Sequence, residues 1–234
     1  MNQKRIEIQP FTIRFHFFLK NKGLHTSTIQ HFSKNLGILQ KDSNLHNLVF
    51  HFTGLDHKIK LGFQEYNINY YHFEDYTSNE KPMYFKGGNA LINSSIINLF
   101  LFVSPIELMS YWQLYKHKLQ ESDLLISFPK IINYKGINEL CNQYPGAKIT
   151  TCFSNSIEGK ISDIKVSLHK IRRTYAIKST DTGIFFINND KSFELPFQKL
   201  SLYQFSLKSK LKNYKIKTHK PPNPFLTFNA IIHD

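Results

Sequence analysis

Cysteine and tryptophan are scarce in this chain of 234 residues, which has two cysteines, Cys141 and Cys152, and one tryptophan. Two cysteines are too few for a disulfide framework, and their spacing is not that of a metal-binding pair. The eleven histidines form neither an HExxH motif nor another paired spacing typical of metal ligands. We therefore expect a cytoplasmic protein of a reducing compartment, with no metal ion or other cofactor.

Several motifs of nucleotide-binding and hydrolytic enzymes are also missing. The chain has no GxxxxGK[ST] loop, no GxGxxG turn and no GxSxG elbow. Long hydrophobic runs are absent too, because the most apolar window, Ile96 to Met109, is too short to span a bilayer and contains Pro105. The apolar stretch from Phe11 to Leu19 is interrupted by Arg14 and His16. We expect neither a signal peptide nor a membrane partner.

Basic residues, in contrast, are abundant. Lys and Arg number 30 against 17 Asp and Glu, which gives a formal net charge of +13. From Gly159 onward there are 14 basic and 5 acidic residues, a balance of +9, whereas the first 158 residues carry 16 and 12, a balance of +4. Such an excess favours a polyanionic partner, because each Lys or Arg that meets a phosphate releases condensed counterions. The alternative is the Lys-rich composition that an AT-rich genome produces without any binding role.

The first 95 residues have the pattern of a small α+β region. Residues 11–19 alternate and predict a strand or an extended arm, and residues 26–36 predict a short helix. Residues 47–52 and 58–65 are typical of two strands joined by a hairpin loop. Residues 74–95 show little periodicity and indicate a long connection. We predict an N-terminal region of residues 1–95 followed by a second domain of residues 96–234.

The second region alternates short apolar strands with helices. Ile96 to Val103 is a continuous apolar run, and Ser104 with Pro105 then forms a typical helix start. Further strands are expected at 124–128, 148–153, 175–178, 183–188 and 214–219, and helices at 106–119, 137–144, 161–172 and 199–212. This alternation predicts an α/β fold with a parallel sheet flanked by helices.

Two of these expected strands end in turns where metal-dependent phosphoryl-transfer sites of α/β proteins carry carboxylates. The turns read Phe102 to Glu107 (FVSPIE) and Phe153 to Gly159 (FSNSIEG). The first has Val103 directly after the strand, and the second has Ser154 and Ser156 in a paired spacing. Neither valine nor serine supplies the negative charge that protein-bound Mg²⁺ usually requires.

The chain here resembles the Toprim domain of DnaG-type primases and of mobile-element proteins. The segment LFLFVSPIELMSY from Leu99 is similar to the first Toprim motif, with Val103 at the place of the family's Glu. The segment TTCFSNSIEG from Thr150 is similar to the second motif, with Ser154 and Ser156 at the places of both Asp, and Gly159 keeps the motif's glycine.

Three weaker similarities follow the same order along the chain. They are residues 21–36 and 50–67, which resemble segments that precede the Toprim core in DnaG-type primases, and residues 221–229, which resemble a C-terminal stretch of mobile-element proteins with Thr227 in the place of an Asp. The resemblance implies a Toprim-like sheet, a nucleic-acid partner (DNA more than RNA), and protein partners in a replication, mobilisation or defence complex.

The missing carboxylates predict a pseudoenzyme, a nucleic-acid-binding protein that does not catalyse chemistry on its partner. An alternative keeps metal-dependent primase or nuclease chemistry at a relocated site formed by Glu107 and Glu158, although Glu107 on the first helical turn could simply complement the dipole of its own helix. A further alternative is a protein-interaction scaffold with an acidic partner.

Basic residues of the last third are the predicted nucleic-acid contacts. They are Lys170, Arg172 and Arg173 at the end of one expected helix, and Lys208, Lys210, Lys212, Lys215 and Lys217 in the tail. In the expected strand 214–219, Lys215, Lys217 and His219 share one face, which would follow phosphates rather than read bases. Several tyrosines of the expected connection are candidates for stacking on bases or for core packing, namely Tyr66, Tyr70, Tyr71, Tyr76 and Tyr84.

Overall fold

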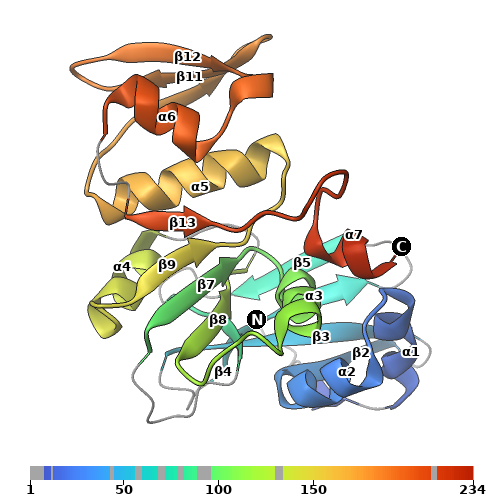
Figure 1. The fold of residues 1–234 in the computed structure, drawn as a ribbon. Helices are drawn as coiled ribbons and strands as arrows, with labels where there is room; N and C mark the ends of the chain where they lie inside the picture. The colour runs from blue at the N-terminus through green and yellow to red at the C-terminus, as the bar shows by residue number, and fades with distance from the viewer. Residues whose placement is uncertain are drawn as a thin grey trace, which may run out of the picture.

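Three β-sheets and their flanking helices make up the part of the chain that the computed structural model describes (Figure 1). The described residues are 8–11, 13–42, 45–55, 60–67, 72–77, 82–88, 96–129, 134–211 and 215–233. The strands are β1 (Ile8–Pro10), β2 (Leu36–Asp42), β3 (Leu45–Thr53), β4 (Lys60–Asn67), β5 (His72–Thr77), β6 (Phe85–Gly88), β7 (Asn98–Phe102), β8 (Asp123–Ser127), β9 (Lys148–Thr151), β10 (Ala176–Ser179), β11 (Gly183–Ile187), β12 (Ser192–Pro196) and β13 (Ile216–Thr218). The helices are α1 (Ile13–Asn21), α2 (Thr26–Phe32), α3 (Pro105–Tyr115), α4 (Tyr134–Gln143), α5 (Ile157–Lys170), α6 (Leu202–Ser209) and α7 (Phe228–His233), with 3-10 turns η1 (Ser33–Asn35) and η2 (Phe197–Lys199).

The central sheet has the strand order β13-β9-β7-β8-β6. Strands β13, β9, β7 and β8 pair in parallel, whereas β6 adds antiparallel to β8 at one edge. All five side chains of β8 are buried, as expected for a strand covered on both faces. The predicted α/β fold, with a mostly parallel sheet flanked by helices, is confirmed, and it is consistent with the Toprim-like architecture that the resemblance implied.

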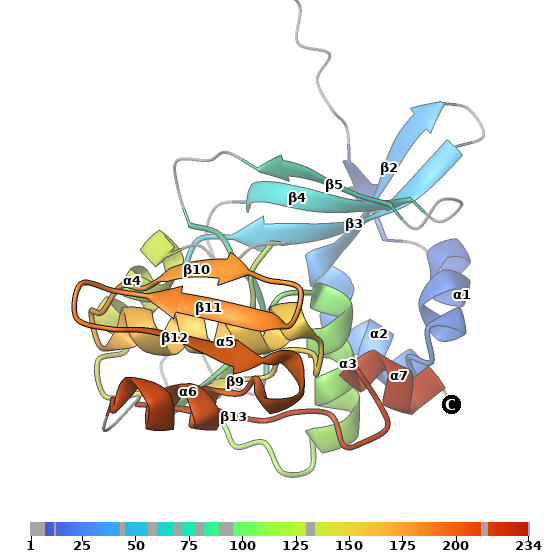
Figure 2. The same ribbon diagram turned by 90° about the horizontal axis from the view of Figure 1, so that it is seen from above.

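Helices cover both faces of this sheet and create two hydrophobic cores (Figures 1 and 2). On one face α3 packs with α2 and α7, in a core that contains Phe102, Met109 and Trp112. On the other face α4 and α5 pack against the sheet, in a core that contains Leu101 and Ile164 and continues into the small sheet β10-β11-β12 with α6. No helix of the described residues is long and apolar enough to cross a membrane.

The N-terminal part forms an antiparallel sheet, β1-β2-β3-β4-β5, that confirms the expected pairing of the strands near 47–52 and 58–65. The loop between them, 56–59, lies outside the described residues. The prediction of a strand or arm at 11–19 was wrong, because residues 13–21 form α1. A nine-residue apolar run fits either period, and here Phe18 and Leu19 are the side chains that the helix buries.

The expected long connection at 74–95 contains strand β6, which the sequence pattern did not reveal. Its sequence, FKGG, has two glycines, and glycine is depleted in strands. Both are needed here: a Cβ at Gly87 would lie 2.4 Å from the Phe32 ring, and Gly88 has a φ of +103°. Because β6 pairs with β8, a segment before residue 96 joins the central sheet. The division at 95/96 stays a prediction.

Candidate functional site

The two turns with the missing carboxylates open at the same edge of the central sheet. Strands β7 and β9 are parallel neighbours, with Leu101 opposite Thr151. Val103 follows β7 directly and is half-buried, and Ser154 and Ser156 follow β9. The spatial arrangement of the two Toprim-like segments is therefore that of adjacent parallel strand ends.

The turn after β9 is held together by its serines. The hydroxyl oxygens of Ser154 and Ser156 lie 2.8 Å apart and form a hydrogen bond. Ser156 is also the N-cap of α5, where its Oγ accepts the N–H of Gly159 at 3.2 Å. Gly159 is required because a Cβ at this position would lie 2.2 Å from the Ser154 carbonyl oxygen. Glu158 is exposed, and hydrogen bonds with its own backbone N–H and with Ser156 lower the pKa of its carboxyl.

The cation at this strand end is the ammonium group of Lys220. Its Nζ donates to the carbonyl oxygens of Phe153 and Ser154 at 3.1 and 3.0 Å, and lies 2.7 Å from Oδ2 of Asp163. Asp163 in turn accepts the Thr151 hydroxyl at 2.7 Å. Burial raises the pKa of Asp163 and lowers the pKa of Lys220, and in both cases the partner's charge acts in the opposite direction. The pair fastens the segment after β13 to the end of β9.

Glu107, one of the two surviving acids, caps a different helix from the one that carries it. Its carboxylate accepts the backbone N–H of Phe228 at 2.7 Å and of Asn229 at 3.2 Å, the first two residues of α7. Burial raises the pKa of Glu107, and the hydrogen bonds with Phe228, Asn229 and Thr227 oppose this shift. The prediction that Glu107 complements the dipole of its own helix therefore needs correction, since its hydrogen bonds go to α7.

The C-terminal segment lies along the same strand ends. The Asn155 N–H donates to the carbonyl of Leu226 at 2.8 Å, and its side-chain amide donates to the carbonyl of Pro221 at 2.8 Å. The hydrogen-bond partners of Glu107 and Glu158 are separate groups, in α7 and in the α5 turn. Within the described ranges, no three His, Cys, Asp or Glu side chains are grouped so that they could hold a metal ion.

The most exposed cations lie at the other end of α5. The helix ends in a Schellman motif, in which the N–H of Arg172 bonds to the carbonyl of His169 at 3.0 Å and the N–H of Arg173 bonds to that of Leu168 at 2.9 Å. Arg172 occupies the left-handed position of this motif, with a φ of +54°, where glycine is the usual residue. Both arginines are exposed. A strained backbone position is thus occupied by a cationic side chain.

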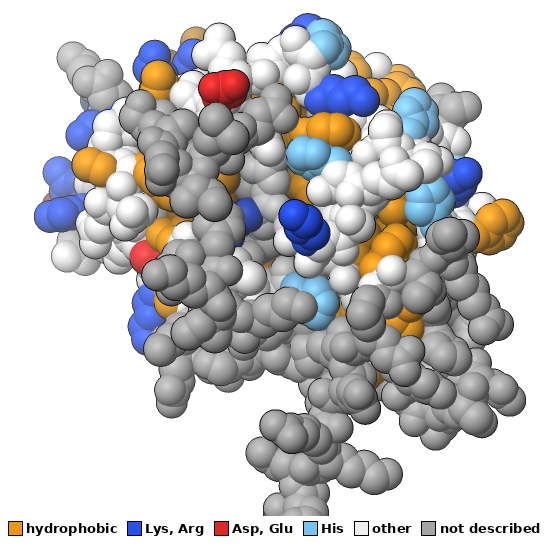
Figure 3. Space-filling view, turned by 90° about the horizontal axis from the view of Figure 1, so that it is seen from below, with side chains coloured by type: hydrophobic (Ala, Val, Ile, Leu, Met, Phe, Trp, Pro, Cys, Tyr) orange, Lys and Arg blue, Asp and Glu red, His pale blue; other side chains and the backbone are white. Residues whose placement is uncertain are grey.

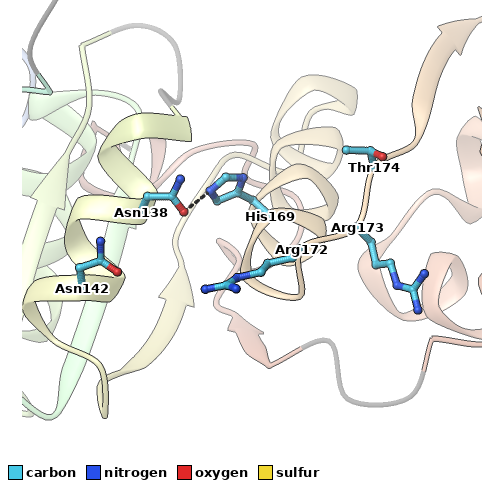
Figure 4. Close-up of a pocket in the computed structure, with 6 residues that line it drawn as sticks. All are labelled: Asn138, Asn142, His169, Arg172, Arg173 and Thr174. Carbon is cyan, nitrogen blue, oxygen red and sulfur yellow. Dashed lines mark hydrogen bonds between the residues drawn. The ribbon is translucent and has the colours of Figure 1, made fainter.

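Two surface cavities flank these arginines. The first, of about 510 Å³, is lined by Asn138, Asn142, His169, Arg172, Arg173 and Thr174. In Figure 4, Arg172 extends toward α4, Arg173 points the opposite way, and the Asn138 amide oxygen lies 2.7 Å from Nε2 of His169. The second, of about 460 Å³, is lined by Arg172, Arg173, Thr174, Ala176, Ile187, Asn188, Asn189 and Asp190. Both walls are rich in amides and cations.

The other predicted nucleic-acid contacts are spread over neighbouring elements. Lys208 and Lys210 are exposed at the end of α6, and Lys191 Nζ joins this end to the β11–β12 turn beside the second cavity by a bond of 3.4 Å to the Ser209 carbonyl. Lys215 and Lys217 are exposed at the edge strand β13, Lys170 Nζ lies 3.6 Å from Cys141 Sγ, and Lys212 lies outside the described residues.

Two expectations about rings and stripes were wrong. His219 does not belong to an exposed stripe with Lys215 and Lys217, because it is half-buried and its Nδ1 lies 2.9 Å from the Tyr111 hydroxyl. Tyr84 is buried in the core, where its hydroxyl donates to Gly136 and contacts Glu139. The side chains of Tyr66, Tyr70, Tyr71 and Tyr76 lie outside the described part of the chain.

Sequence reasoning missed the residues around the arginines and the strand-end ion pair. Asn138, Asn142 and His169 belong to no motif, and only the fold brings α4 beside α5. Burial lowers the pKa of His169. Asp163 did carry a detectable pattern, since it lies four residues after Gly159 on the apolar face of α5, where an acid requires a partner.

Comparisons with known proteins give little further information. No protein family and no curated protein matches the chain. Among solved structures, one match is a chain of the bacteriophage T7 lagging-strand DNA polymerase interacting with the primase domains of two gp4 subunits bound to an RNA/DNA hybrid and dTTP. It is 14% identical, covers 63% of this chain and 71% of that chain, and has a TM-score of 0.45. A match of this quality assigns neither a family nor an activity.

Proposed function

We propose that this protein binds nucleic acid through the basic end of α5 and does so without metal-dependent chemistry. The observation that carries the proposal is Arg172, an exposed arginine at a left-handed backbone position where glycine would cost less. Together with Arg173 it separates two cavities lined by amides and by His169. Guanidinium groups suit phosphate oxygens because they present several donors in a fixed plane.

The hydrogen bonds at the strand ends support the second half of the proposal. The positions that resemble Toprim ligands hold Val103, Ser154 and Ser156, and a lysine ammonium already occupies the carbonyl oxygens after β9. Glu107 is engaged by two backbone N–H groups, so recruiting it as a ligand would leave those donors unsatisfied. The Toprim-like resemblance, the pseudoenzyme interpretation and a role in a mobile-element complex remain part of this proposal.

A salt titration of oligonucleotide affinity tests the binding. We expect a linear fall of log affinity with log salt, and a slope that becomes shallower by about 1 for each phosphate-binding side chain that a substitution removes. Arg172→Gly is the informative variant, because it removes the cation while relieving the backbone, and it should weaken binding without harming the fold. Lys165→Ala is the matched control, since Lys165 is exposed on the same helix and lines neither cavity.

Three outcomes would contradict the proposal. Absence of measurable affinity at low salt, or an affinity without a salt slope, would remove nucleic acid as the partner. Equal effects of Arg172→Gly and Lys165→Ala would show that binding depends on diffuse charge rather than on the α5 end. Co-purification with an acidic protein in the absence of oligonucleotide binding would favour the scaffold alternative.

A further inference from the structure

The opposite face of the central sheet carries a stacked pair of rings. His31 of α2 lies flat against Trp112 of α3, with 4.2 Å between the ring centroids and 17° between the planes. Phe32 meets the same indole edge-on at 5.7 Å. The indole is 7% exposed, whereas His31 is exposed. One face of the imidazole is therefore fixed against tryptophan while the side chain remains open to solvent.

The orientation of His31 is held from two directions. Besides the stack, its ring is hydrogen-bonded to the backbone of Gly88 at the end of β6. Gly88 has a φ of +103°, a conformation that other residues rarely adopt, and α2 can approach β6 because Gly87 has no side chain. Two glycines at the edge of the sheet thus position a histidine ring whose place is set before any partner binds.

The choice of tryptophan beneath this histidine has a cost. Its Nε1 is buried and has no hydrogen-bond partner among the described residues. A phenylalanine would fill the core without an unsatisfied donor. The larger indole surface is what the position gains, and that surface is the support of the exposed imidazole.

Cations surround the stacked pair. Lys116 Nζ lies 5.0 Å from the Trp112 ring centroid, and Lys116, His117 and Lys118 are exposed at the end of α3. The stretch from Ile13 to Leu39, which includes α1 and α2, has four Lys or Arg and three His but no Asp or Glu. In Figure 3, His and Lys or Arg side chains are interspersed with apolar ones on the side of the molecule where α1, α2 and α3 lie. Aromatic surface among positive charge suits a strand of nucleotides.

From this arrangement we infer that His31, supported by Trp112, is a stacking site for a base of single-stranded nucleic acid. A base can lie on the imidazole only if its own face is uncovered, which excludes a base within an intact duplex. The lysines after α3 would then meet the adjoining phosphates. This inference rests on the proposed nucleic-acid binding and adds a second binding surface, on the face of the sheet opposite to Arg172 and Arg173.

The chain's single tryptophan makes the inference directly measurable. Titration with an oligothymidylate should change Trp112 fluorescence, because the base stacks on the ring that covers the indole, whereas a duplex of equal length should bind without this change. His31→Ala should weaken single-strand affinity about 5- to 100-fold, the usual range for one aromatic–base stack. His31→Phe should retain most of the affinity, which would separate stacking from charge.

His25→Ala is the matched control, since His25 is an exposed histidine at the start of the same helix. Affinity is followed independently by the anisotropy of a labelled oligonucleotide, and thermal unfolding checks that each variant folds. The inference is overturned if anisotropy reports binding while Trp112 fluorescence stays constant, or if His31→Ala binds like the His25→Ala control. Loss of all anisotropy signal in the wild-type chain would instead overturn the proposed function, and the stacking site with it.

Discussion

Replacing Glu107 by alanine is expected to lower the free energy of unfolding by about 2–4 kcal/mol. The carboxylate accepts two backbone N–H groups of α7, at 2.7 and 3.2 Å, and each such bond to a charged acceptor contributes about 1.5–3 kcal/mol. Part of this gain is offset by the desolvation that raises the pKa of Glu107. Alanine would remove both acceptors and leave the N–H groups of Phe228 and Asn229 unsatisfied.

Chemical denaturation of the whole chain measures this destabilisation, and hydrogen exchange locates it. The amides of α7 should lose protection in Glu107→Ala before those of β7 and β9 do, because the substitution acts first on the docking of that helix. Glu107→Gln keeps one acceptor oxygen, and it should cost less than about 1 kcal/mol since burial already favours a neutral group there.

Glu158→Ala is the comparison variant, because Glu158 is also an acid in the first turn of a helix but is exposed. Exposed charges of this kind contribute within about 0.5 kcal/mol. If Glu107→Ala unfolds at the same denaturant concentration as Glu158→Ala, the carboxylate is not held by α7. Glu107 would then be available as a metal ligand, and the explanation of why the strand ends bind no metal would be refuted.

Three further outcomes are expected. Because the folded chain raises the pKa of Glu107 above its ordinary value of 4.5, the folded state binds this proton more tightly than the unfolded state; the stability of the wild-type chain relative to Glu107→Gln should therefore be greatest below pH 4.5 and fall as the pH rises through the raised pKa, in denaturation measured across that range. Lys220→Met should destabilise the chain by about 3–5 kcal/mol, since it leaves the Asp163 carboxylate buried without its counter-charge, and the double variant with Asp163→Leu should recover much of that stability in the same assay. Arg172→Gly should leave thermal stability unchanged or raise the free energy of unfolding by up to about 1 kcal/mol, and a marked destabilisation would show that Arg172 is needed for folding.

The central part of the fold follows from the sequence because its strands are short apolar runs with clear helix starts. Ser104 and Pro105 stand at the predicted N-cap and first position of α3. β8 and β9 also begin within one residue of their expected positions. In these elements the local pattern and the packing agree, since both faces of the sheet are covered by helices.

The elements that the pattern missed depend on distant parts of the chain. β6 exists because its glycines accept the Phe32 ring and the end of β8, which no local periodicity expresses. α7 has six residues and no cap of high propensity, and its first N–H groups are satisfied by Glu107, 121 positions earlier in the chain. The roles of Glu107 and Lys220 could not be read from their neighbours for the same reason, because their partners come from the opposite end of the domain.

A binding measurement carried out with and without divalent metal tests the central claim most directly. A labelled single-stranded oligonucleotide is titrated with the chain in EDTA and again in Mg²⁺ or Mn²⁺, and its length is analysed after long incubation with nucleotides. We predict equal affinity at matched ionic strength, a salt slope that Arg172→Gly reduces, and an oligonucleotide that is neither cleaved nor extended. Metal-dependent cleavage or primer synthesis that Glu107→Gln or Glu158→Gln abolishes would contradict this claim.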